Sequence, residues 1–370
     1  MTLVNAASEG ASDALHVRAR AFVAAFEAGV AMPESFDALA CDLARFQATQ
    51  VEGFARLCRA RGVDVSLIDR AHHVPAVPTD AFKLTRVATF AHESSVVTFR
   101  TSGTTVGARG AHSMRTTLTY DAGALAFGRW ALARDLRTRP AVIVVGPSPN
   151  EACDSSLTHM IALFACALGR LAPAGDTYFI EAGELRVDAL CARIAGLDPF
   201  VPALVLGTSF GFVHLLDALR ARAHTPSLAL PKGSRIMQTG GFKGRSREVD
   251  ADALRRELAE LFAVSVSAIV SEYGMTELSS QFYDAQPAPG VFVEPPWARV
   301  VPVDPETLAP VGSGEIGIAR IEDLLNVDSA LAVLAADRVR RVDGGFELLG
   351  RATGAAPRGC SIAIDEILSE

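Results

Sequence analysis

Short apolar runs that end in glycine- or serine-containing loops fill the middle of the sequence and most constrain its fold. Segments of helical character separate them. Such runs are typical of parallel strands buried on both faces, which need helical crossovers. We therefore expect an α/β fold with ligands at the carboxyl ends of the strands, although for any single loop a tight turn is reason enough for glycine. The expected strands are 141–145, 203–206, 235–237 and 268–270, and the expected helices are 120–134, 156–169, 209–222 and 249–262.

The two ends of the chain have different patterns. Apolar residues at spacings of three and four predict a long amphipathic helix over 34–61, and we expect a shorter helix over 13–28. After several prolines at 287–296, strands at 300–303, 314–320 and 346–349 are expected to pair in an antiparallel sheet. We predict a large domain over 1–294, a small β-rich subdomain over 295–350, and a tail over 351–370 that carries Cys360.

Charge and cysteine content argue against several classes of protein. The net charge is −7, whereas a nucleic-acid-binding protein normally shows a basic face, so we expect no nucleic-acid partner. No apolar stretch approaches the length of a membrane helix, and the N-terminus does not resemble a signal peptide. The six cysteines form no C-x-x-C pair, which argues against a metal or disulfide framework. We expect a cytoplasmic protein without a membrane span.

A run of hydroxyl side chains around one glycine is the first candidate site. It reads Thr101-Ser102-Gly103-Thr104-Thr105. A loop of this composition can place backbone N–H groups and hydroxyls around phosphates. It is not a P-loop, because the G-x-x-x-x-G-K-[ST] pattern is absent. Taken alone, a polar turn is the simpler interpretation of this run.

A second candidate site follows the last of the expected parallel strands. Tyr273 offers an aromatic face for a purine, and Gly274 allows close approach of a backbone. Thr276 can donate to a phosphate oxygen, and Glu277 is the kind of hard oxygen ligand that Mg²⁺ prefers. The structural alternative is a solvated turn between a strand and a helix.

Together these two motifs, in this order, resemble those of the ANL adenylate-forming superfamily. Further landmarks support the resemblance: a glycine pair before the tyrosine motif, a G-x-x-G-E turn at 312–316, and an aspartate and an arginine near the end. The resemblance implies an ANL-type fold and the use of ATP and Mg²⁺. It implies that the hydroxyl-rich loop binds phosphates, that Thr276, Glu277 and Arg351 are catalytic, that Glu277 holds the metal, and that Gly240, Gly241, Tyr273, Gly274 and Asp337 bind the nucleotide.

Two features depart from the superfamily pattern. Its phosphate loop usually ends in Pro-Lys, whereas Gly107-Ala108-Arg109 stands here. The superfamily also has a C-terminal domain with a catalytic lysine, and this sequence ends at Glu370, soon after Arg351. We therefore expect a chain without the lysine domain.

The ending Arg358-Gly359-Cys360-Ser361, together with the segment at 75–83, resembles the LuxE-type acyl-protein synthetases. In that family an acyl-adenylate passes its acyl group to a cysteine near the C-terminus and then to a partner reductase. The resemblance implies that Cys360 is this cysteine, that the acid is a fatty acid, and that a reductase or another acyl-acceptor protein is the partner.

The chemistry of sulfur independently favours this role for Cys360. A thiolate attacks an activated acyl group, and Arg351 and Arg358 could favour its ionisation. The alternative for a cysteine is a small buried hydrophobe, which we expect of Cys41, Cys58, Cys166 and Cys191, with Cys153 less certain. For His112, a contact with phosphate or carboxylate and a structural role are both open.

Two other functions remain open from the sequence. The protein could adenylate an acid and load it onto CoA or a carrier protein, with Cys360 in a structural role. It could also be a non-catalytic relative that acts as a scaffold, for which the departure at Arg109 is the only support.

Overall fold

The chain folds into two compact units in the computed structural model. Unit 1 comprises Met1–Ala126, Met275–Gln281 and Val291–Glu370, and unit 2 comprises Phe127–Gly274 and Phe282–Gly290. This division follows different lines from the three predicted domains, which stay predictions. The structure describes residues 3–101, 108–170, 172–222, 227–240, 250–284, 289–352 and 358–368.

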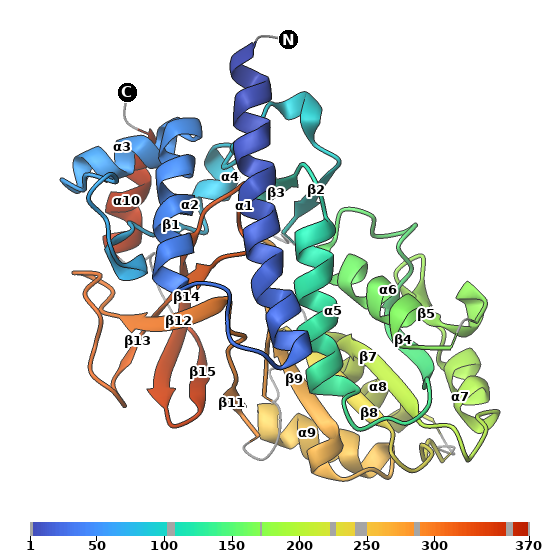
Figure 1. Ribbon diagram of the computed structural model, residues 1–370. Helices are drawn as coiled ribbons and strands as arrows, with labels where there is room; N and C mark the ends of the chain where they lie inside the picture. Colours follow the sequence, from blue (N-terminus) through green and yellow to red (C-terminus); the bar gives the residue numbers. More distant parts are fainter. Residues whose placement is uncertain are drawn as a thin grey trace. The chain divides into compact units, whose positions relative to one another are not determined.

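A seven-stranded sheet forms the centre of unit 2 (Figure 1). Neighbouring strands β4, β7, β8 and β9 run parallel, as the buried apolar runs predict. Two short strands at the edges, β6 and β10, are antiparallel to their neighbours. The order is β10 (Phe282–Tyr283), β9 (Ile269–Tyr273), β8 (Arg235–Thr239), β7 (Ala203–Thr208), β4 (Ala141–Pro147), β5 (Tyr178–Glu181) and β6 (Glu184–Leu185).

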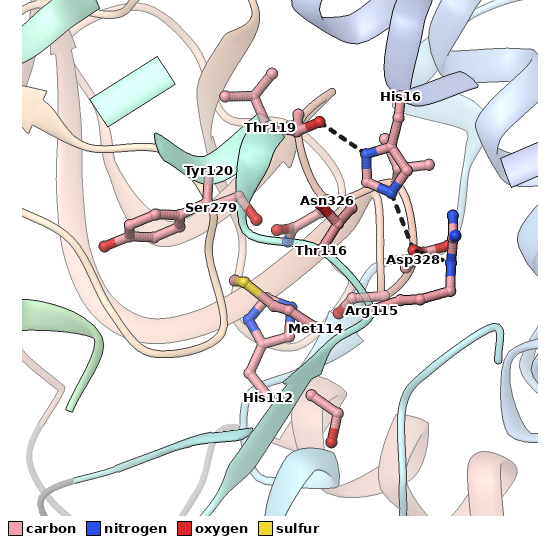
Figure 2. A pocket seen from close by; sticks show the side chains of 14 residues that line it. His16, His112, Met114, Arg115, Thr116, Thr119, Tyr120, Ser279, Asn326 and Asp328 are labelled. Carbon is pink, nitrogen blue, oxygen red and sulfur yellow. Dashed lines mark hydrogen bonds and ion pairs between the residues drawn. The ribbon is translucent and has the colours of Figure 1, made fainter. Parts of the chain in front are cut away.

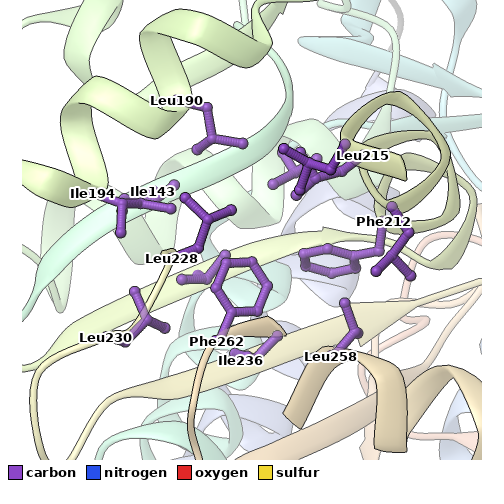
Figure 3. Close-up of a cluster of buried hydrophobic side chains, with 14 of the residues drawn as sticks. Ile143, Leu190, Ile194, Phe212, Leu215, Leu228, Leu230, Ile236, Leu258 and Phe262 are labelled. Carbon is purple, nitrogen blue, oxygen red and sulfur yellow. The ribbon is translucent and has the colours of Figure 1, made fainter. Parts of the chain in front are cut away.

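Helices cover both faces of this sheet. On one face α7 (Val187–Ala195), α8 (Ser209–Arg220) and α9 (Ala251–Leu261) bury a single hydrophobic cluster that includes Leu190, Phe212 and Leu258 (Figure 3). Each fully buried phenylalanine or leucine contributes about 1.5–3 kcal/mol. On the other face lies α6 (Ser156–Ala167), which contacts β4. Three of these helices begin at a hydroxyl or carboxylate cap: Ser155, Thr208 and Asp250.

An antiparallel sheet forms the centre of unit 1. It confirms the strands predicted in the C-terminal part, and it adds β14, which the sequence pattern did not predict. The turn between β14 and β15 contains Gly344 at φ +84°, a conformation that favours glycine. The order is β11 (Val291–Phe292), β15 (Gly345–Arg351), β14 (Ala332–Val342), β13 (Ile316–Asp323) and β12 (Ala298–Val303), and β1 (Val77–Pro78) pairs in parallel with β14.

The N-terminal helices of unit 1 correct two expectations. The first helix, α1 (Leu3–Ala28), is longer than predicted. The single helix predicted over 34–61 is wrong, because α2 (Phe36–Gln50) ends and α3 (Glu52–Ala60) begins around Val51. Val51 has extended dihedral angles, φ −109° and ψ 96°. One extended residue turns the chain while leaving the apolar spacing of each half intact.

The remaining elements are short or link the units. Helix α5 (Leu118–Leu132) begins in unit 1 and ends in unit 2. No helix in the described ranges is long and apolar enough to span a membrane. The others are β2 (Val97–Arg100), β3 (Ala111–Met114), α4 (Ala81–Leu84), α10 (Arg358–Leu368), η1 (Ala71–His73), η2 (His92–Ser94), η3 (Ala174–Asp176) and η4 (Val266–Ala268).

Candidate active site

The hairpin of β2 and β3 holds the two ends of the predicted phosphate loop together. Thr101 N–H donates to the carbonyl of Gly110 at 2.9 Å, and Gly110 N–H donates to Thr101 Oγ1 at 2.9 Å. Arg109 Nε donates to the Thr101 carbonyl at 2.6 Å. Of the predicted loop residues only Thr101 is described, and Ser102, Gly103, Thr104 and Thr105 lie outside the described ranges. The base of the loop is therefore well defined by its hydrogen bonds.

Glu277 lies beside this hairpin base. A Cβ atom placed on Gly110 would come within 3.0 Å of Thr101 Cγ2 and 3.4 Å of Glu277 Oε1. Glycine at position 110 thus lets the backbone approach the carboxylate closely. Thr101 and Glu277, which are distant in sequence, therefore both lie close to Gly110 within unit 1.

A magnesium ion is compatible with the donors at this place. Among the residues that the structure describes, no group of three or more His, Cys, Asp or Glu side chains could hold a metal. Mg²⁺ needs no such cage, because it is usually held by one or two carboxylates together with substrate phosphates and water. Glu277, beside the hairpin that carries the predicted phosphate loop, would supply the protein's part of such a site.

His112 contacts the same motif from β3. Its Nδ1 donates to the carbonyl of Thr276 at 2.7 Å, so Nδ1 carries the hydrogen. Burial lowers the pKa of His112 to about 4, and the imidazole is neutral at pH 7. The sequence left two roles open for His112, a contact with phosphate or carboxylate and a structural role. The observed contact of Nδ1 is with a main-chain carbonyl, which is a structural role.

Two residues that the sequence analysis missed hold the rest of the motif. Asn326 Nδ2 donates to the carbonyl of Glu277 at 3.0 Å. Asp323 Oδ2 accepts the N–H groups of Ser279 at 2.9 Å and Ser280 at 2.8 Å. All are buried. The available signal was the mixture of polar and apolar residues over 321–329, which includes Asp323 and Asn326, but the partners of these two residues could not be read from the sequence.

A small polar pocket lies next to these residues in unit 1 (Figure 2). It encloses about 280 Å³ of empty space, part of which is open to solvent. His16 Nε2 lies 2.9 Å from Asp328 Oδ2, and the hydroxyls of Ser12 and Thr89 donate to Asp328 Oδ1. Burial would raise the pKa of Asp328, but these hydrogen bonds and the charge of His16 outweigh it and hold the pKa at about 2. The pocket is lined by His16, His112, Ser113, Met114, Arg115, Thr116, Thr119, Tyr120, Ser279, Leu325, Asn326, Val327, Asp328 and Ser329.

The predicted ribose and hinge residues are neighbours on the sheet of unit 1. Asp337 on β14 pairs in register with Arg351 on β15. Arg351 Nε lies 3.8 Å from Asp337 Oδ1, and the Arg351 side chain is 62% exposed. Asp337 thus stands next to a cation that is open to solvent, which suits a position at the edge of a ligand site.

The predicted adenine residues end two neighbouring strands of unit 2. Gly240 follows β8 at φ +77°, and Tyr273 is the last residue of β9. Gly274 follows directly, and Gly241 lies outside the described ranges. The Tyr273 ring is buried, with its centroid 6.0 Å from that of Phe282. The structure therefore brings Gly240 and Tyr273 to the same carboxyl edge of the sheet.

Glu272 is a second titratable group at this edge that the sequence analysis did not select. It is fully buried, and Thr239 donates its hydroxyl hydrogen to the carboxylate. Burial raises the pKa of Glu272 to about 7, although the bond from Thr239 lowers it. Its protonation is therefore balanced near neutral pH.

Cys360 lies in the last helix, α10, and contradicts one expectation. The residue is only 5% exposed, and burial, followed by the negative charge of Asp80, raises the pKa of its thiol to about 11. The prediction that Arg351 and Arg358 favour ionisation is therefore wrong for this state: loss of water around the sulfur outweighs any such attraction. The Arg358 side chain is outside the described part.

Helix α10 is anchored to α3 (Figure 1). Arg56 donates from Nε and Nη2 to the carbonyl of Ile367 at 2.9 and 2.7 Å, and Arg61 Nε donates to Glu366 Oε2 at 2.7 Å. Because Ile367 lies in the last turn, Arg56 also satisfies an otherwise open helix carbonyl. These contacts hold Cys360 in its buried position.

The other cysteines follow the expectation with one exception. Cys41 and Cys58 are buried and Cys191 is half-buried. Cys153 and Cys166 are exposed, so the prediction that Cys166 is a buried hydrophobe is wrong. Cys166 lies in the last turn of α6, on a helix face turned away from the core.

Comparison with known proteins places the chain among adenylate-forming ligases. It matches the family model "Acyl-protein synthetase, LuxE" over residues 32–369. It is 23% identical over 333 residues to the "Long-chain-fatty-acid--luciferin-component ligase" of Vibrio harveyi, a match that covers 85% of this chain and 83% of that protein.

Solved structures show the fold. The 2-hydroxyisobutyryl-CoA ligase in the postadenylation state with 2-HIB-AMP has a TM-score of 0.62 at 15% identity, covering 85% of this chain and 67% of that chain. Its open conformation with 2-HIB-AMP and CoA has a TM-score of 0.60 at 16% identity, covering 85% and 74%. ATP-bound MatB from Rhodopseudomonas palustris has a TM-score of 0.47 at 16% identity, and the match covers 71% of this chain and 49% of that chain, so this chain spans about half of MatB. The likeness to the first ligase confirms the predicted ANL-type α/β fold.

Proposed function

Because this chain belongs to the LuxE family of acyl-protein synthetases, we propose that it activates a fatty acid with ATP and passes the acyl group to its own Cys360. Family membership makes it an ATP-dependent ligase of the AMP-forming type. The proposal that Cys360 accepts the acyl group rests on the span of the family match, which ends at residue 369 and so includes Cys360.

In the first half of the proposed reaction, a carboxylate oxygen attacks the α-phosphorus of ATP. A new P–O bond forms, the bond to the β-phosphate breaks, and pyrophosphate leaves. We assign the phosphates to the hairpin that begins at Thr101, and the ribose to Asp337. Thr276 and Arg351 would contact the charge that develops during transfer. Mg²⁺ held by Glu277 would neutralise negative charge on the phosphate oxygens.

We assign the adenine to the carboxyl edge of the sheet in unit 2. Gly240 and Tyr273 end neighbouring strands there, and Gly241 and Gly274 extend the same two loops. Glycines let the backbone approach a flat base, and an aromatic ring can support one of its faces.

In the second half, the Cys360 sulfur attacks the acyl carbon. A C–S bond forms and AMP leaves with the electron pair of the broken C–O bond. The thiol must first lose its proton, and with a pKa of about 11 only about one molecule in 10,000 is ionised at about pH 7. We therefore propose that Cys360 leaves its buried position before it reacts.

The test separates the two half-reactions. Acid-dependent ATP–pyrophosphate exchange measures adenylation, and incorporation of a radiolabelled fatty acid into protein measures acylation. We expect Cys360→Ser to retain exchange and lose the label. Cys58→Ser is the matched control, since burial also raises the pKa of the Cys58 thiol, to about 12, and this variant should keep both activities. Label that survives Cys360→Ser would contradict the proposal.

The second candidate function is loading of CoA or a carrier protein. The burial of Cys360 favours it, because a buried thiol is also what a structural role predicts. Under this function, Cys360→Ser would transfer the acyl group to CoA or to a carrier protein at the wild-type rate.

The final acceptor and the compartment follow from the thioester chemistry. A thioester keeps the acyl group reactive, so we propose hand-off to an acyl reductase or another acceptor protein. A cysteine that works as a thiol needs a reducing compartment, which favours the cytoplasm. Transfer of label from the acylated protein to a purified acyl reductase measures the first of these steps.

A further inference from the structure

The short segment Met275–Gln281 packs in unit 1, although the chain on both sides of it belongs to unit 2. Side chains of unit 1 bind its main chain at several points. His112 binds the carbonyl of Thr276, and Asn326 binds the carbonyl of Glu277. The segment is therefore held by donors that the surrounding fold supplies.

These two contacts define the backbone around Glu277. The carbonyl of Thr276 belongs to the peptide plane before Glu277, and the carbonyl of Glu277 belongs to the plane after it. Because each peptide unit is planar, fixing both planes fixes φ and ψ of the residue between them. The direction in which the Glu277 side chain leaves the backbone is then determined.

Each donor is itself held in place. Asn326 Nδ2 also donates to the carbonyl of Ala330 at 3.0 Å. Gln47 on α2 donates to the carbonyl of Asn326 at 2.8 Å and accepts the N–H of Leu331 at 2.9 Å. The loop that presents Asn326 is therefore fixed to a buried helix position.

His112 lies on β3, opposite Phe99 of β2 in the pairing register. Its ring and that of Phe82 form a T-shaped pair, with the ring centroids 5.9 Å apart. The imidazole is buried and neutral, and its one N–H hydrogen is on Nδ1, the nitrogen that faces the carbonyl of Thr276.

We propose that His112 and Asn326 are positioning residues for adenylation: they aim Thr276 and Glu277 at the phosphates and metal of bound ATP by fixing the two peptide planes around Glu277. The proposal rests on the proposed function, because it takes Glu277 as the metal ligand. Loss of a partner that orients a metal ligand typically costs about 10- to 100-fold in metal affinity or activity.

The test compares variants that lose the donor with variants that keep it. His112→Leu removes the donor, whereas His112→Asn keeps an amide N–H near the position of Nδ1. Asn326→Leu keeps about the size of the side chain but has no hydrogen to donate and adds no charge. Arg320→Lys is the matched control, because Arg320 also binds buried carbonyls, those of Ala71 at 3.0 Å and Val74 at 2.7 Å, in a segment that holds no predicted site residue.

Two readouts are measured for each variant. One is the rate of acid-dependent ATP–pyrophosphate exchange, with kcat and the KM for ATP determined separately. The other is Mn²⁺ binding in the presence of ATP, followed by electron paramagnetic resonance. We expect His112→Leu and Asn326→Leu to lose about 10- to 100-fold in kcat and in Mn²⁺ affinity, with a smaller change in KM. His112→Asn and Arg320→Lys should stay close to wild type.

The outcomes distinguish this proposal from the proposed function. Wild-type protein without any exchange would overturn the proposed function, and Mn²⁺ binding would still test the positioning. Equal Mn²⁺ affinity and equal kcat in all variants would overturn the positioning, as would losses in Arg320→Lys as large as those in His112→Leu. Circular dichroism verifies folding, and Asn326→Leu carries the test if His112→Leu does not fold.

Discussion

Release of α10 from α3 should make the Cys360 thiol reactive. The double variant Arg56→Met, Arg61→Met removes the donors that hold the Ile367 carbonyl and Glu366. With water around the sulfur, the pKa should fall from about 11 toward the ordinary 9.0. Because only the thiolate is alkylated, this change corresponds to about a 100-fold faster reaction at about pH 7.5.

The assay is alkylation of Cys360 by iodoacetamide, followed by mass spectrometry of the C-terminal peptide. Arg59→Met is the matched control, since Arg59 lies on the same helix and pairs with Glu52 at the surface. We expect wild type and Arg59→Met to react slowly and at the same rate. An equally slow reaction of the double variant would refute the view that these contacts keep the thiol buried.

The same pKa shift predicts how docking of α10 depends on pH. The thiol has a raised pKa in the docked state, so its burial is fully favourable below the ordinary pKa of 9.0 and becomes unfavourable as pH rises through about 11. Hydrogen exchange of the α10 amides should therefore show protection that falls between pH 9 and pH 11, beyond the fall seen in α8, a helix without cysteine that serves as reference. A protection that is flat across this range would contradict it.

Further predictions concern stability and the phosphate hairpin. Asp328→Asn should lower the free energy of unfolding at pH 7 by about 2 kcal/mol, and with it the melting temperature, because the pKa of Asp328 is held at about 2. This loss should shrink as the pH falls from the ordinary pKa of 3.8 toward 2. Glu272→Gln should raise the melting temperature relative to wild type above pH 7 but not near pH 5, because the raised pKa of Glu272 makes its burial costly once the carboxyl ionises; an identical shift at both pH values would contradict this. Gly110→Val should lower pyrophosphate exchange about tenfold or more, since a Cβ at 3.0 Å from Thr101 and 3.4 Å from Glu277 displaces one of them; exchange at the wild-type rate would show that this approach does not matter.

The parallel sheet of unit 2 could be predicted because its strands are buried on both faces. Apolar runs such as 141–145 and 203–206 need no partner to be recognised, and the glycines that end them mark the ligand edge. Gly240 and Tyr273 therefore reached the same edge in the structure as in the prediction.

The prediction of one helix over 34–61 was wrong because the spacing of apolar residues does not reveal a break of one residue. Phe46 and Phe54 are eight residues apart, which fits two turns of one helix, yet the extended Val51 lies between them. Each of the two helices keeps its own apolar face toward the core. A break of one residue thus leaves the hydrophobic pattern unchanged.

The environment of Cys360 was predicted from its polar neighbours, and this was misleading. Cys360, Ala363 and Ile367 are all buried and recur at spacings of three and four, which is the pattern of an amphipathic helix. That signal was present in the sequence. The contacts of Asn326 and Asp323 with 276–280 could not be predicted from the sequence, because they join segments that only the fold brings together.

The central claim is that Cys360 carries the acyl group. Peptide mapping by mass spectrometry, after incubation with ATP, Mg²⁺ and a fatty acid, tests it directly. We expect an acyl mass on the peptide that contains Cys360, removable by neutral hydroxylamine and absent when ATP is left out. An acyl mass on exposed Cys153 or Cys166 instead, or pyrophosphate release with Cys360 unmodified, would contradict it.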